Sequence, residues 1–394
     1  MSFRGTFSAL SINGFQSIVG PQWRLVDTKT FSFPIGQPVF SENGNYMAIY
    51  SVYDSNATGA VYIYYNGGSG TSWTLQQTII GTSPNQEFGT GLSLNDDGTY
   101  LAIGAPGQTS QVGAVHIYTR SGTIWSFQQQ FIASDGQIGD RFGQTVSLSG
   151  NATYLVSGAP QEDTTPFTQN GAAYVFIRSG TTWTQQQKLL SPVASRGNTD
   201  FFGSTLQISQ DGSYLVVGAP LHDGGGPPSS NFGRAYIFIR SGTTWTLQSS
   251  FSGVGISNSE FGVTVNIDNT GTLVCIREEG STLLYFYTRS GTTWTQTQVI
   301  NYGAYAPTII NNSTNKGTAM QGTAINLIIG LFVNERTLAI TNNSTSYQID
   351  QELFSGITPV PQEFGTYVGI ARTANVCAVT GAGATPSVYI YIKE

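Results

Sequence analysis

A tryptophan recurs along this chain in one fixed setting, as the last residue of the motif Gly-Thr-x-Trp. The five copies end at Trp73, Trp125, Trp183, Trp245 and Trp294. Trp23 and Tyr347 take the corresponding slots near the two ends, and the steps between successive slots are 50, 52, 58, 62, 49 and 53 residues. Such a period suits a four-stranded propeller blade. The repeat therefore predicts one ring of seven units, although the length of 394 residues alone suggests two or three domains.

Each unit contains four short segments with the period-two alternation of sheet strands. The first segment opens with Phe-Gly, and a short hairpin such as Asn95–Gly98 leads to the second, which ends in Gly-Ala-Pro at Gly104–Pro106, Gly158–Pro160 and Gly218–Pro220. A loop of variable length precedes the third segment, and a Ser-Gly hairpin leads to the Trp segment. Asp-Gly and Ser-Gly pairs suit tight turns because glycine tolerates positive φ. No segment has a convincing helical period, so an all-β protein is expected.

This combination resembles the FG-GAP repeat family, which includes the integrin α-chain propellers, and is closest to its short-hairpin subtype of bacteria and large DNA viruses. The resemblance covers about residues 20–394. Units one, five and six depart from the pattern, with Phe33-Pro34-Ile35-Gly36, Arg277-Glu278-Glu279 and Tyr305-Ala306. The expected fold is a seven-bladed β-propeller of four-stranded antiparallel blades, in which the Trp23 strand completes the last blade. Glycine is expected where blades approach closely, with Phe and Trp rings filling the space between them.

Residues 1–19 precede the first propeller strand and have no counterpart in the repeat. This N-terminal arm is too apolar for a free tail, because it contains Phe3, Phe7, Leu10, Ile12, Phe15 and Ile18. We expect it to pack on the propeller, residues 20–394, or on a neighbouring subunit, which leaves self-assembly through the arm open. The arm lacks the apolar core of a signal peptide, and no stretch is long enough to span a membrane. Synthesis in the cytoplasm is expected, with incorporation into a virion as one destination.

Charge and cysteine content exclude several kinds of protein. Only 10% of residues are charged, the net charge is −6, and the chain has no basic block. Nucleic-acid binding and attraction to an anionic membrane both need clustered Lys and Arg, so neither is expected. The two cysteines, Cys275 and Cys377, lie in apolar strands of different units and are predicted to be buried thiols without a disulfide.

Few residues suggest metal binding or catalysis. The family resemblance raises calcium, but Asp96, Asp97 and Asp211 give each hairpin at most two acids, too few to surround the ion. His116 occupies a strand position that holds tyrosine in other units and is interpreted as a packing residue. No catalytic triad, zinc motif or phosphate loop is present. We therefore expect no catalytic residues, no metal and no cofactor, with an enzyme kept as the least favoured alternative.

The longest variable loops surround units three and four, whereas the hairpins predicted on the opposite face stay short. Loops on a rigid scaffold commonly carry recognition. The candidate binding residues are Glu162, Asp163, Phe167, Arg196, Asp200, His222 and Asp223. The sequence thus favours a non-catalytic recognition or adhesion module for protein or glycan. The alternatives are a structural component of a virion or surface fibre, and loop variation without any ligand.

Overall fold

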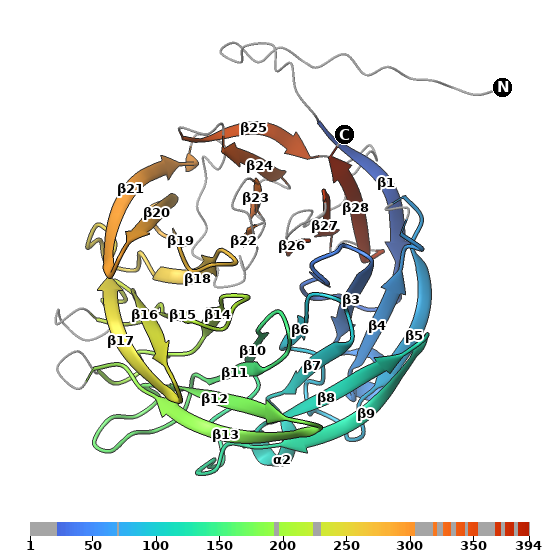
Figure 1. Ribbon diagram of the computed structural model, residues 1–394, viewed down its shortest axis with the longest axis horizontal. Helices are drawn as coiled ribbons and strands as arrows, with labels where there is room; N and C mark the ends of the chain where they lie inside the picture. The colour runs from blue at the N-terminus through green and yellow to red at the C-terminus, as the bar shows by residue number, and fades with distance from the viewer. Residues whose placement is uncertain are drawn as a thin grey trace.

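The computed structural model describes residues 22–68, 71–192, 197–223, 230–303, 318–320, 326–331, 336–342, 346–353, 367–371, 375–381 and 385–393. The strands in these ranges form seven four-stranded sheets arranged around a common axis (Figure 1). Every strand pair is antiparallel, and in six sheets the strands lie side by side in chain order. The prediction of an all-β propeller with four-stranded antiparallel blades is confirmed. The N-terminal arm, residues 1–19, lies outside the described residues.

The sheets are called blades 1 to 7 in the order of their inner strands. Blade 1 contains β2 (Val39–Phe40), β3 (Tyr46–Ser51), β4 (Ala60–Tyr65) and β5 (Thr74–Ile80). Blade 2 contains β6 (Leu92–Leu94), β7 (Tyr100–Ala105), β8 (Ala114–Ser121) and β9 (Ile124–Phe131). Blade 3 contains β10 (Thr145–Leu148), β11 (Tyr154–Ala159), β12 (Ala172–Ser179) and β13 (Thr182–Leu189). Blade 4 contains β14 (Thr205–Ile208), β15 (Tyr214–Ala219), β16 (Arg234–Ser241) and β17 (Thr244–Phe251).

The remaining blades continue this order. Blade 5 contains β18 (Phe261–Ile267), β19 (Leu273–Glu278), β20 (Leu283–Ser290) and β21 (Thr293–Asn301). Blade 6 contains β22 (Thr318–Met320), β23 (Asn326–Leu331), β24 (Arg336–Asn342) and β25 (Tyr347–Leu353). Blade 7 contains β26 (Val368–Ile370), β27 (Val376–Gly381), β28 (Ser387–Lys393) and β1 (Trp23–Thr30). Two helical turns, α1 (Asp54–Ala57) and α2 (Gln108–Gln111), lie between the second and third strands of blades 1 and 2.

The strand that contains Trp23 is the outer strand of the last blade, as the sequence predicts. β1 pairs with β28 along its length, with Trp23 opposite Lys393 and Thr30 opposite Ser387. Chain segments more than 350 residues apart are thereby joined by backbone hydrogen bonds, so that the N-terminal strand completes the blade formed by the last three strands.

The hydrophobic core lies between neighbouring blades. In one cluster, for example, Val156 and Val175 of blade 3 pack with Leu215, Tyr236 and Trp245 of blade 4. The repeated phenylalanines are fully enclosed, at 0–1% exposure, and are Phe88, Phe142, Phe202 and Phe261. Both cysteines are buried free thiols, as predicted.

Glycines permit the closest approach of one blade to the next. A Cβ atom on Gly158, at the end of β11, would lie 2.1 Å from the carbonyl oxygen of Gly203 in the following Phe-Gly pair. A Cβ atom on Gly104 would lie 1.9 Å from the Gly143 carbonyl oxygen, and one on Gly218 would lie 2.2 Å from the Gly262 carbonyl oxygen. These distances are too short for any side chain, which confirms the predicted reason for pairing Gly-Ala-Pro with Phe-Gly.

Glutamines on the outer strands of five blades, 1, 2, 3, 5 and 6, tie each of these blades to the next one. The Gln187 amide accepts a hydrogen bond from the backbone N–H of Trp245, at 2.7 Å, and donates one to its carbonyl oxygen, at 2.9 Å. Gln77 makes the same two bonds to Trp125. Gln351 binds Trp23 in this way and so links blade 6 to blade 7. A β-bulge lies next to this position in each outer strand, as between the pairing partners of Val175 and Phe176, and such bulges re-aim side chains.

Arginines from the repeated Arg-Ser-Gly segment lock the hairpins and reach the preceding blade. Arg178 donates to the carbonyl oxygens of Ala152, at 2.6 Å, and Gly180, at 3.0 Å, which belong to the two hairpins of blade 3. Its guanidinium lies over the ring of Tyr100 in blade 2, at 4.6 Å from the ring centre. Equivalent contacts are made by Arg120, Arg240 and Arg289. The conspicuous Arg-Ser-Gly motif is therefore explained by the fold.

At the boundary between blades 4 and 5, the outer strand has a serine where other outer strands carry the side chain that hydrogen-bonds to the backbone of the next blade. Ser249 lies opposite Ile237, just as Gln187 lies opposite Val175. Ser249→Gln is expected to raise the free energy of unfolding by about 1 kcal/mol, because the new amide can bind the backbone of Trp294. Denaturant unfolding measures the change. Thr246→Gln, at an exposed position of the same strand, is the control, and an equal gain there would contradict the explanation.

Candidate functional site

The variable loops of blades 3 and 4 are joined into one surface by backbone hydrogen bonds. The loop between β11 and β12 accepts bonds from the loop between β13 and β14: Thr199 N–H to Thr168 O at 2.8 Å, and Phe202 N–H to Asn170 O at 2.9 Å. We call the side of the ring that carries these two kinds of loop the loop face. It also carries α1 and lies behind in Figure 1. The prediction that these loops share one face is therefore confirmed.

The opposite face carries the short hairpins, which meet across the axis of the ring. The Gln210 amide of blade 4 donates to Asp96 Oδ1 of blade 2 at 2.7 Å. The Asn269 amide of blade 5 donates to Glu42 Oε1 of blade 1 at 2.8 Å. Asp97 Oδ1 accepts from the Thr99 backbone and hydroxyl in its own turn. The hairpin acids thus act as turn and contact residues within the fold.

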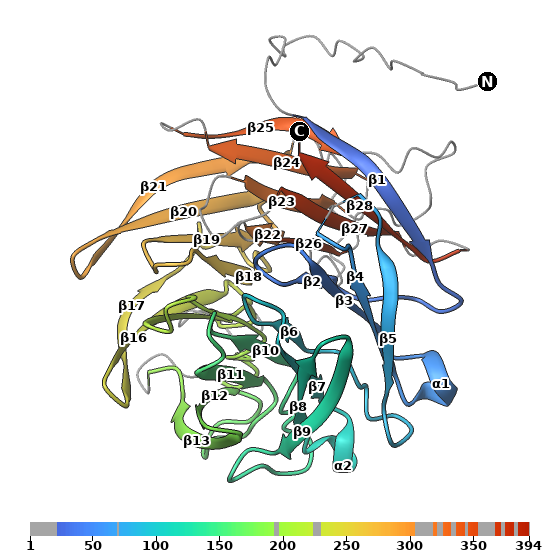
Figure 2. The ribbon, with the colours of Figure 1, turned by 45° about the vertical axis from the view of Figure 1, so that its right-hand side comes forward.

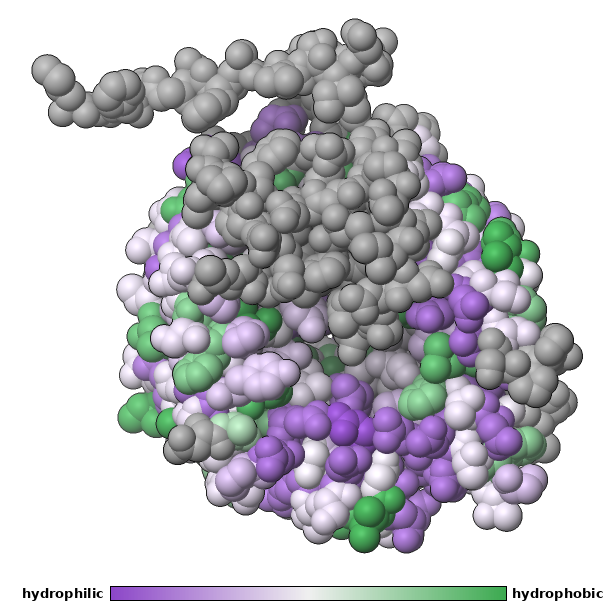
Figure 3. Space-filling model, turned by 180° about the vertical axis from the view of Figure 1, so that it is seen from behind, coloured by the Kyte–Doolittle hydropathy of each residue, from purple (hydrophilic) through white to green (hydrophobic). Residues whose placement is uncertain are grey.

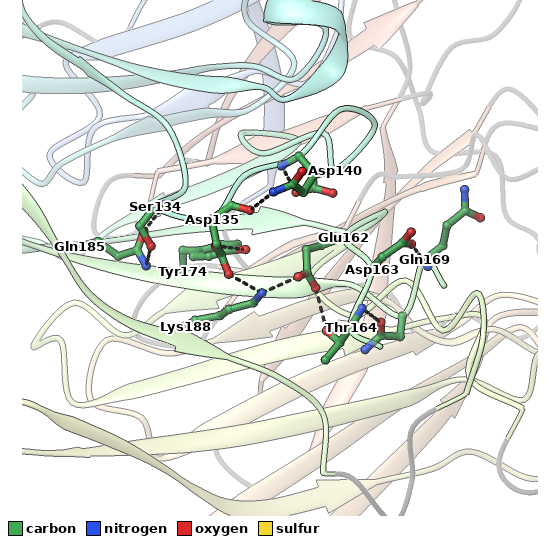
Figure 4. Close-up of polar contacts among 12 residues, drawn as sticks. Ser134, Asp135, Asp140, Glu162, Asp163, Thr164, Gln169, Tyr174, Gln185 and Lys188 are labelled. Atoms are coloured by element: carbon green, nitrogen blue, oxygen red, sulfur yellow. Dashed lines mark hydrogen bonds and ion pairs between the residues drawn. The ribbon is translucent and has the colours of Figure 1, made fainter. Parts of the chain in front are cut away.

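A lysine links two of the loops on the loop face (Figure 4). Lys188, on β13, forms an ion pair with Asp135 Oδ2 at 2.8 Å and another with Glu162 Oε1. Asp135 lies in the loop between blades 2 and 3, whereas Glu162 follows β11. The Tyr174 hydroxyl donates to Asp135 Oδ1 at 3.0 Å, and the Thr164 hydroxyl donates to Glu162 Oε2 at 2.9 Å. We call Asp135, Glu162, Tyr174 and Lys188 the lysine network.

The lysine network places one ammonium between two carboxylates. Burial lowers the pKa of Lys188, but its hydrogen bonds to Asp135 and Glu162 raise it by more, so the pKa lies above its ordinary value. Burial raises the pKa of the nearby Asp140 carboxyl, and the negative charge of Glu162 adds to the effect. The ammonium therefore stays charged near neutral pH and holds the two loops together.

The candidate residues of blade 3 differ in how far they reach solvent. Glu162 is only 6% exposed and points toward Lys188, so it supports the loop from within. Asp163 is exposed, and its Oδ1 accepts from the Gln169 backbone N–H at 2.7 Å. Phe167 is half-buried, and its backbone N–H donates to Thr164 O at 2.8 Å. Among these three, Asp163 and Phe167 present side chains to solvent.

The candidate residues of blade 4 form a second group. Asp200 is fully buried, and its Oδ2 accepts from the Gly197 backbone N–H at 2.6 Å. Burial raises the pKa of Asp200, which His222 lowers and Asp223 raises through their charges, so these side chains are neighbours. His222 is 3% exposed, whereas Asp223 is half-buried and its Oδ1 accepts from the Asn231 backbone N–H at 3.1 Å. Arg196 lies outside the described residues.

The placement corrects one part of the sequence interpretation. Glu162, Asp200 and His222 were expected to contribute to an exposed surface, but all three side chains are buried. The loops turn these polar groups inward, where they satisfy other polar groups that the loop conformation buries. Within the described ranges, no three His, Cys, Asp or Glu side chains gather closely enough to hold a metal ion.

Three residues of the lysine network were missed from sequence, namely Asp135, Tyr174 and Lys188. A signal existed for Lys188, because the same position of the outer strand holds Thr78, Gln130 and Ser250 in blades 1, 2 and 4. Blade 6 carries Glu352 at this position, so Lys188 is the one positive charge there among the seven blades and marks a local specialisation.

His116 is a packing residue, as predicted. It is 5% exposed, its ring lies edge-on to Phe88 with 5.3 Å between centres, and its Nε2 is 2.8 Å from Gln108 Oε1. Its strand position holds Tyr62, Tyr174 and Tyr236 in other blades.

The burial of His116 predicts a specific dependence of stability on pH. Desolvation lowers its pKa from 6.5 to about 4, so the unfolded chain binds more protons between these values. The contribution of neutral His116 to the free energy of unfolding is fully present above pH 6.5. It decreases by about 3 kcal/mol as the pH falls toward 4. His116→Tyr is expected to remove this component, as measured by denaturant unfolding from pH 7 to pH 4. Parallel curves for the two proteins would contradict the assignment.

The ring of four-stranded blades and its repeated Phe-Gly contacts define a repeat-built β-propeller. Residues 125–176 and 183–238 match the family described as FG-GAP repeat. The chain thus contains FG-GAP repeats, and together with its propeller fold this is consistent with the FG-GAP propeller family that its motifs resemble. No curated protein matches the chain.

Two solved structures share the fold. The Cps50 (Swd1) β-propeller domain of Myceliophteria thermophila is 12% identical, with a TM-score of 0.65, and the alignment covers 94% of this chain and 99% of that one. A functionally unknown protein from Desulfotomaculum acetoxidans is 11% identical, with a TM-score of 0.58, and the alignment covers 83% of this chain and 87% of that one. At such low identity the likeness concerns the fold alone. Within the described ranges, no helix has the length and apolar character needed to cross a membrane.

Proposed function

We propose that this protein is a non-catalytic recognition module that binds a protein or a glycan through the loop face of blades 3 and 4. The observation that carries the proposal is the pair of long loops, residues 160–171 and 190–204, whose described residues hydrogen-bond to each other on the ring of blades. Preorganised loops lose little conformational freedom on binding, which favours affinity.

The opposite face is less suited to recognition. Its short hairpins are bonded to one another across the axis, through Gln210 with Asp96 and through Asn269 with Glu42. The loop face, by contrast, presents polar groups to solvent, and hydrophilic residues gather in the lower half of the view from behind (Figure 3). Asp163, Asp135 and Asp223 lend it negative charge that suits a ligand with positive charge or many hydrogen-bond donors.

The side chains of the lysine network support recognition over catalysis. Lys188 is paired with two carboxylates from different loops, and Tyr174 donates to one of them. The arrangement fixes the shape of these two loops and leaves Asp163 exposed, whereas Asp223 lies in the corresponding loop of blade 4. A specific binding surface needs contact residues that are held in place by buried polar contacts beneath them.

Charge reversal at the loop edges tests the proposal. Asp163→Lys with Asp223→Lys is expected to weaken binding at least tenfold, about 1.4 kcal/mol, for a ligand found in a screen of glycans and extracellular proteins. The control is Asp97→Lys with Asp211→Lys, which makes the same charge change at exposed turn acids of the hairpin face. Calorimetry or surface binding measures both affinities. Equal losses, or no loss, would place the ligand elsewhere.

A size measurement on the purified protein addresses the alternative function. A monomer that binds a ligand supports recognition. A defined higher assembly without a ligand would instead favour a structural component of a virion or surface fibre.

A further inference from the structure

The outer strands of blades 1 and 2 expose an unusual number of large apolar side chains. Members of this group are 49–63% exposed and are Leu75, Ile80, Ile124, Phe127 and Ile132. We call these five residues the apolar rim. Single exposed apolar residues are ordinary, but a group on two adjacent strands commonly marks a contact surface.

The fold itself does not require apolar residues at these positions. Leu75 lies opposite Tyr64, and Phe127 lies opposite Tyr118, in equivalent places of two blades. The equivalent position is Gln185 in blade 3 and Gln296 in blade 5. The same position is apolar in blades 4, 6 and 7, with Leu247, Ile349 and Leu25, so it tolerates both kinds of side chain. Blades 1 and 2 differ in exposing further large apolar residues on or next to the same strand, namely Ile80 in blade 1 and Ile124 and Ile132 in blade 2.

The apolar rim adjoins the strand by which the N-terminal arm enters the propeller. Asp27 Oδ2 of β1 accepts from the Trp73 backbone N–H of β5 at 2.8 Å. In turn, Gln77 of β5 binds the backbone of Trp125 in β9. The three outer strands β1, β5 and β9 therefore follow one another around the ring, as Figures 1 and 2 both show.

We propose that residues 1–19 dock on the apolar rim of the same molecule. The arm supplies six large apolar residues for this contact, three of them phenylalanines: Phe3, Phe7, Leu10, Ile12, Phe15 and Ile18. The first 21 residues of the chain span up to about 70 Å when extended. Trp23 and Leu75 are separated by about six residues along their strands, roughly 20 Å, so the reach is ample.

Attachment to the same molecule favours this docking over docking on a second copy. A short tether holds the segment at an effective concentration in the millimolar range beside the rim. A second molecule at micromolar concentration competes poorly with an arm at this effective concentration, unless the geometry prevents intramolecular contact. Covering the rim also removes apolar surface from water, which favours docking. This inference is independent of the proposed binding function, which uses loops of blades 3 and 4.

Hydrogen exchange on the full chain tests the docking. Amides of residues 7–19 are expected to exchange at least tenfold more slowly than in a synthetic peptide of residues 1–21, at a rate independent of protein concentration. Leu75→Ser with Phe127→Ser is expected to remove that protection. All of these changes lie at exposed positions, so the propeller folds in each variant.

Leu247→Ser is the matched control, because Leu247 is 41% exposed at the equivalent position of blade 4, far along the ring from β1. It is expected to leave the arm protected. Exchange as fast as in the peptide would overturn the proposal, as would an equal effect of the control. Protection that grows with concentration and accompanies a dimer mass would also overturn it and assign the rim to a second copy.

Discussion

Arg277→Met is expected to lower the free energy of unfolding by about 3–5 kcal/mol, because it leaves a buried carboxylate without its cation. Arg277 is 1% exposed and occupies the place that Gly218 holds in blade 4. Its Nη2 lies 3.0 Å from Glu279 Oε2, and its Nε donates to the Tyr302 hydroxyl at 3.0 Å. Glu279 is itself only 7% exposed. Denaturant unfolding at neutral pH measures the loss, which is a large share of typical stability.

A second substitution separates the charge effect from the loss of packing. Adding Glu279→Gln to Arg277→Met removes the orphaned negative charge, and about 1–3 kcal/mol is expected to return. If the double variant is as unstable as the sum of the two single variants, the ion pair is not what stabilises this part of blade 5.

Gly158→Ala is expected to lower the free energy of unfolding by about 3 kcal/mol, because the new methyl group would lie 2.1 Å from the Gly203 carbonyl oxygen. The obstacle is backbone, so blades 3 and 4 must separate to accommodate it. The thermal midpoint and the denaturant midpoint should both fall.

Gly136→Ala provides the comparison for that variant. Gly136 does not have a positive φ, and a Cβ there would lie 3.2 Å from Val112 Cγ1 and 3.3 Å from the Ala133 carbonyl oxygen, so shifts of a few tenths of an ångström accommodate it. A change within about 0.5–1 kcal/mol is expected there. Similar losses at both glycines would refute the idea that close approach between blades makes Gly158 necessary.

Several features of the candidate site could be predicted from the sequence. Loop lengths identified the long segments around Glu162 and His222, and the topology of the family that the motifs resemble predicted both kinds of loop on one face. The sequence could not reveal which side chains turn inward. Asp163 and Glu162 are adjacent in sequence, yet one is exposed and the other is paired with Lys188, 26 residues away.

Contacts between blades were equally hard to predict, although the glutamines that make them recur in most repeats. Gln187 lies 58 residues from Trp245, and Gln351 lies 328 residues from Trp23. A local pattern shows that glutamine recurs on the outer strand, but not that a bulge aims it at the backbone of the next blade.

The amino-acid sequence alone determined the repeat, the four strands of each unit and the strand that contains Trp23. Turn residues and the alternation of apolar and polar residues act over a few neighbouring positions, so they can be read locally. Only the tertiary structure decided which polar side chains meet. The network around Lys188 and the ion pair of Arg277 with Glu279 depend on loop paths and on packing between units, and these are settled by the whole ring at once.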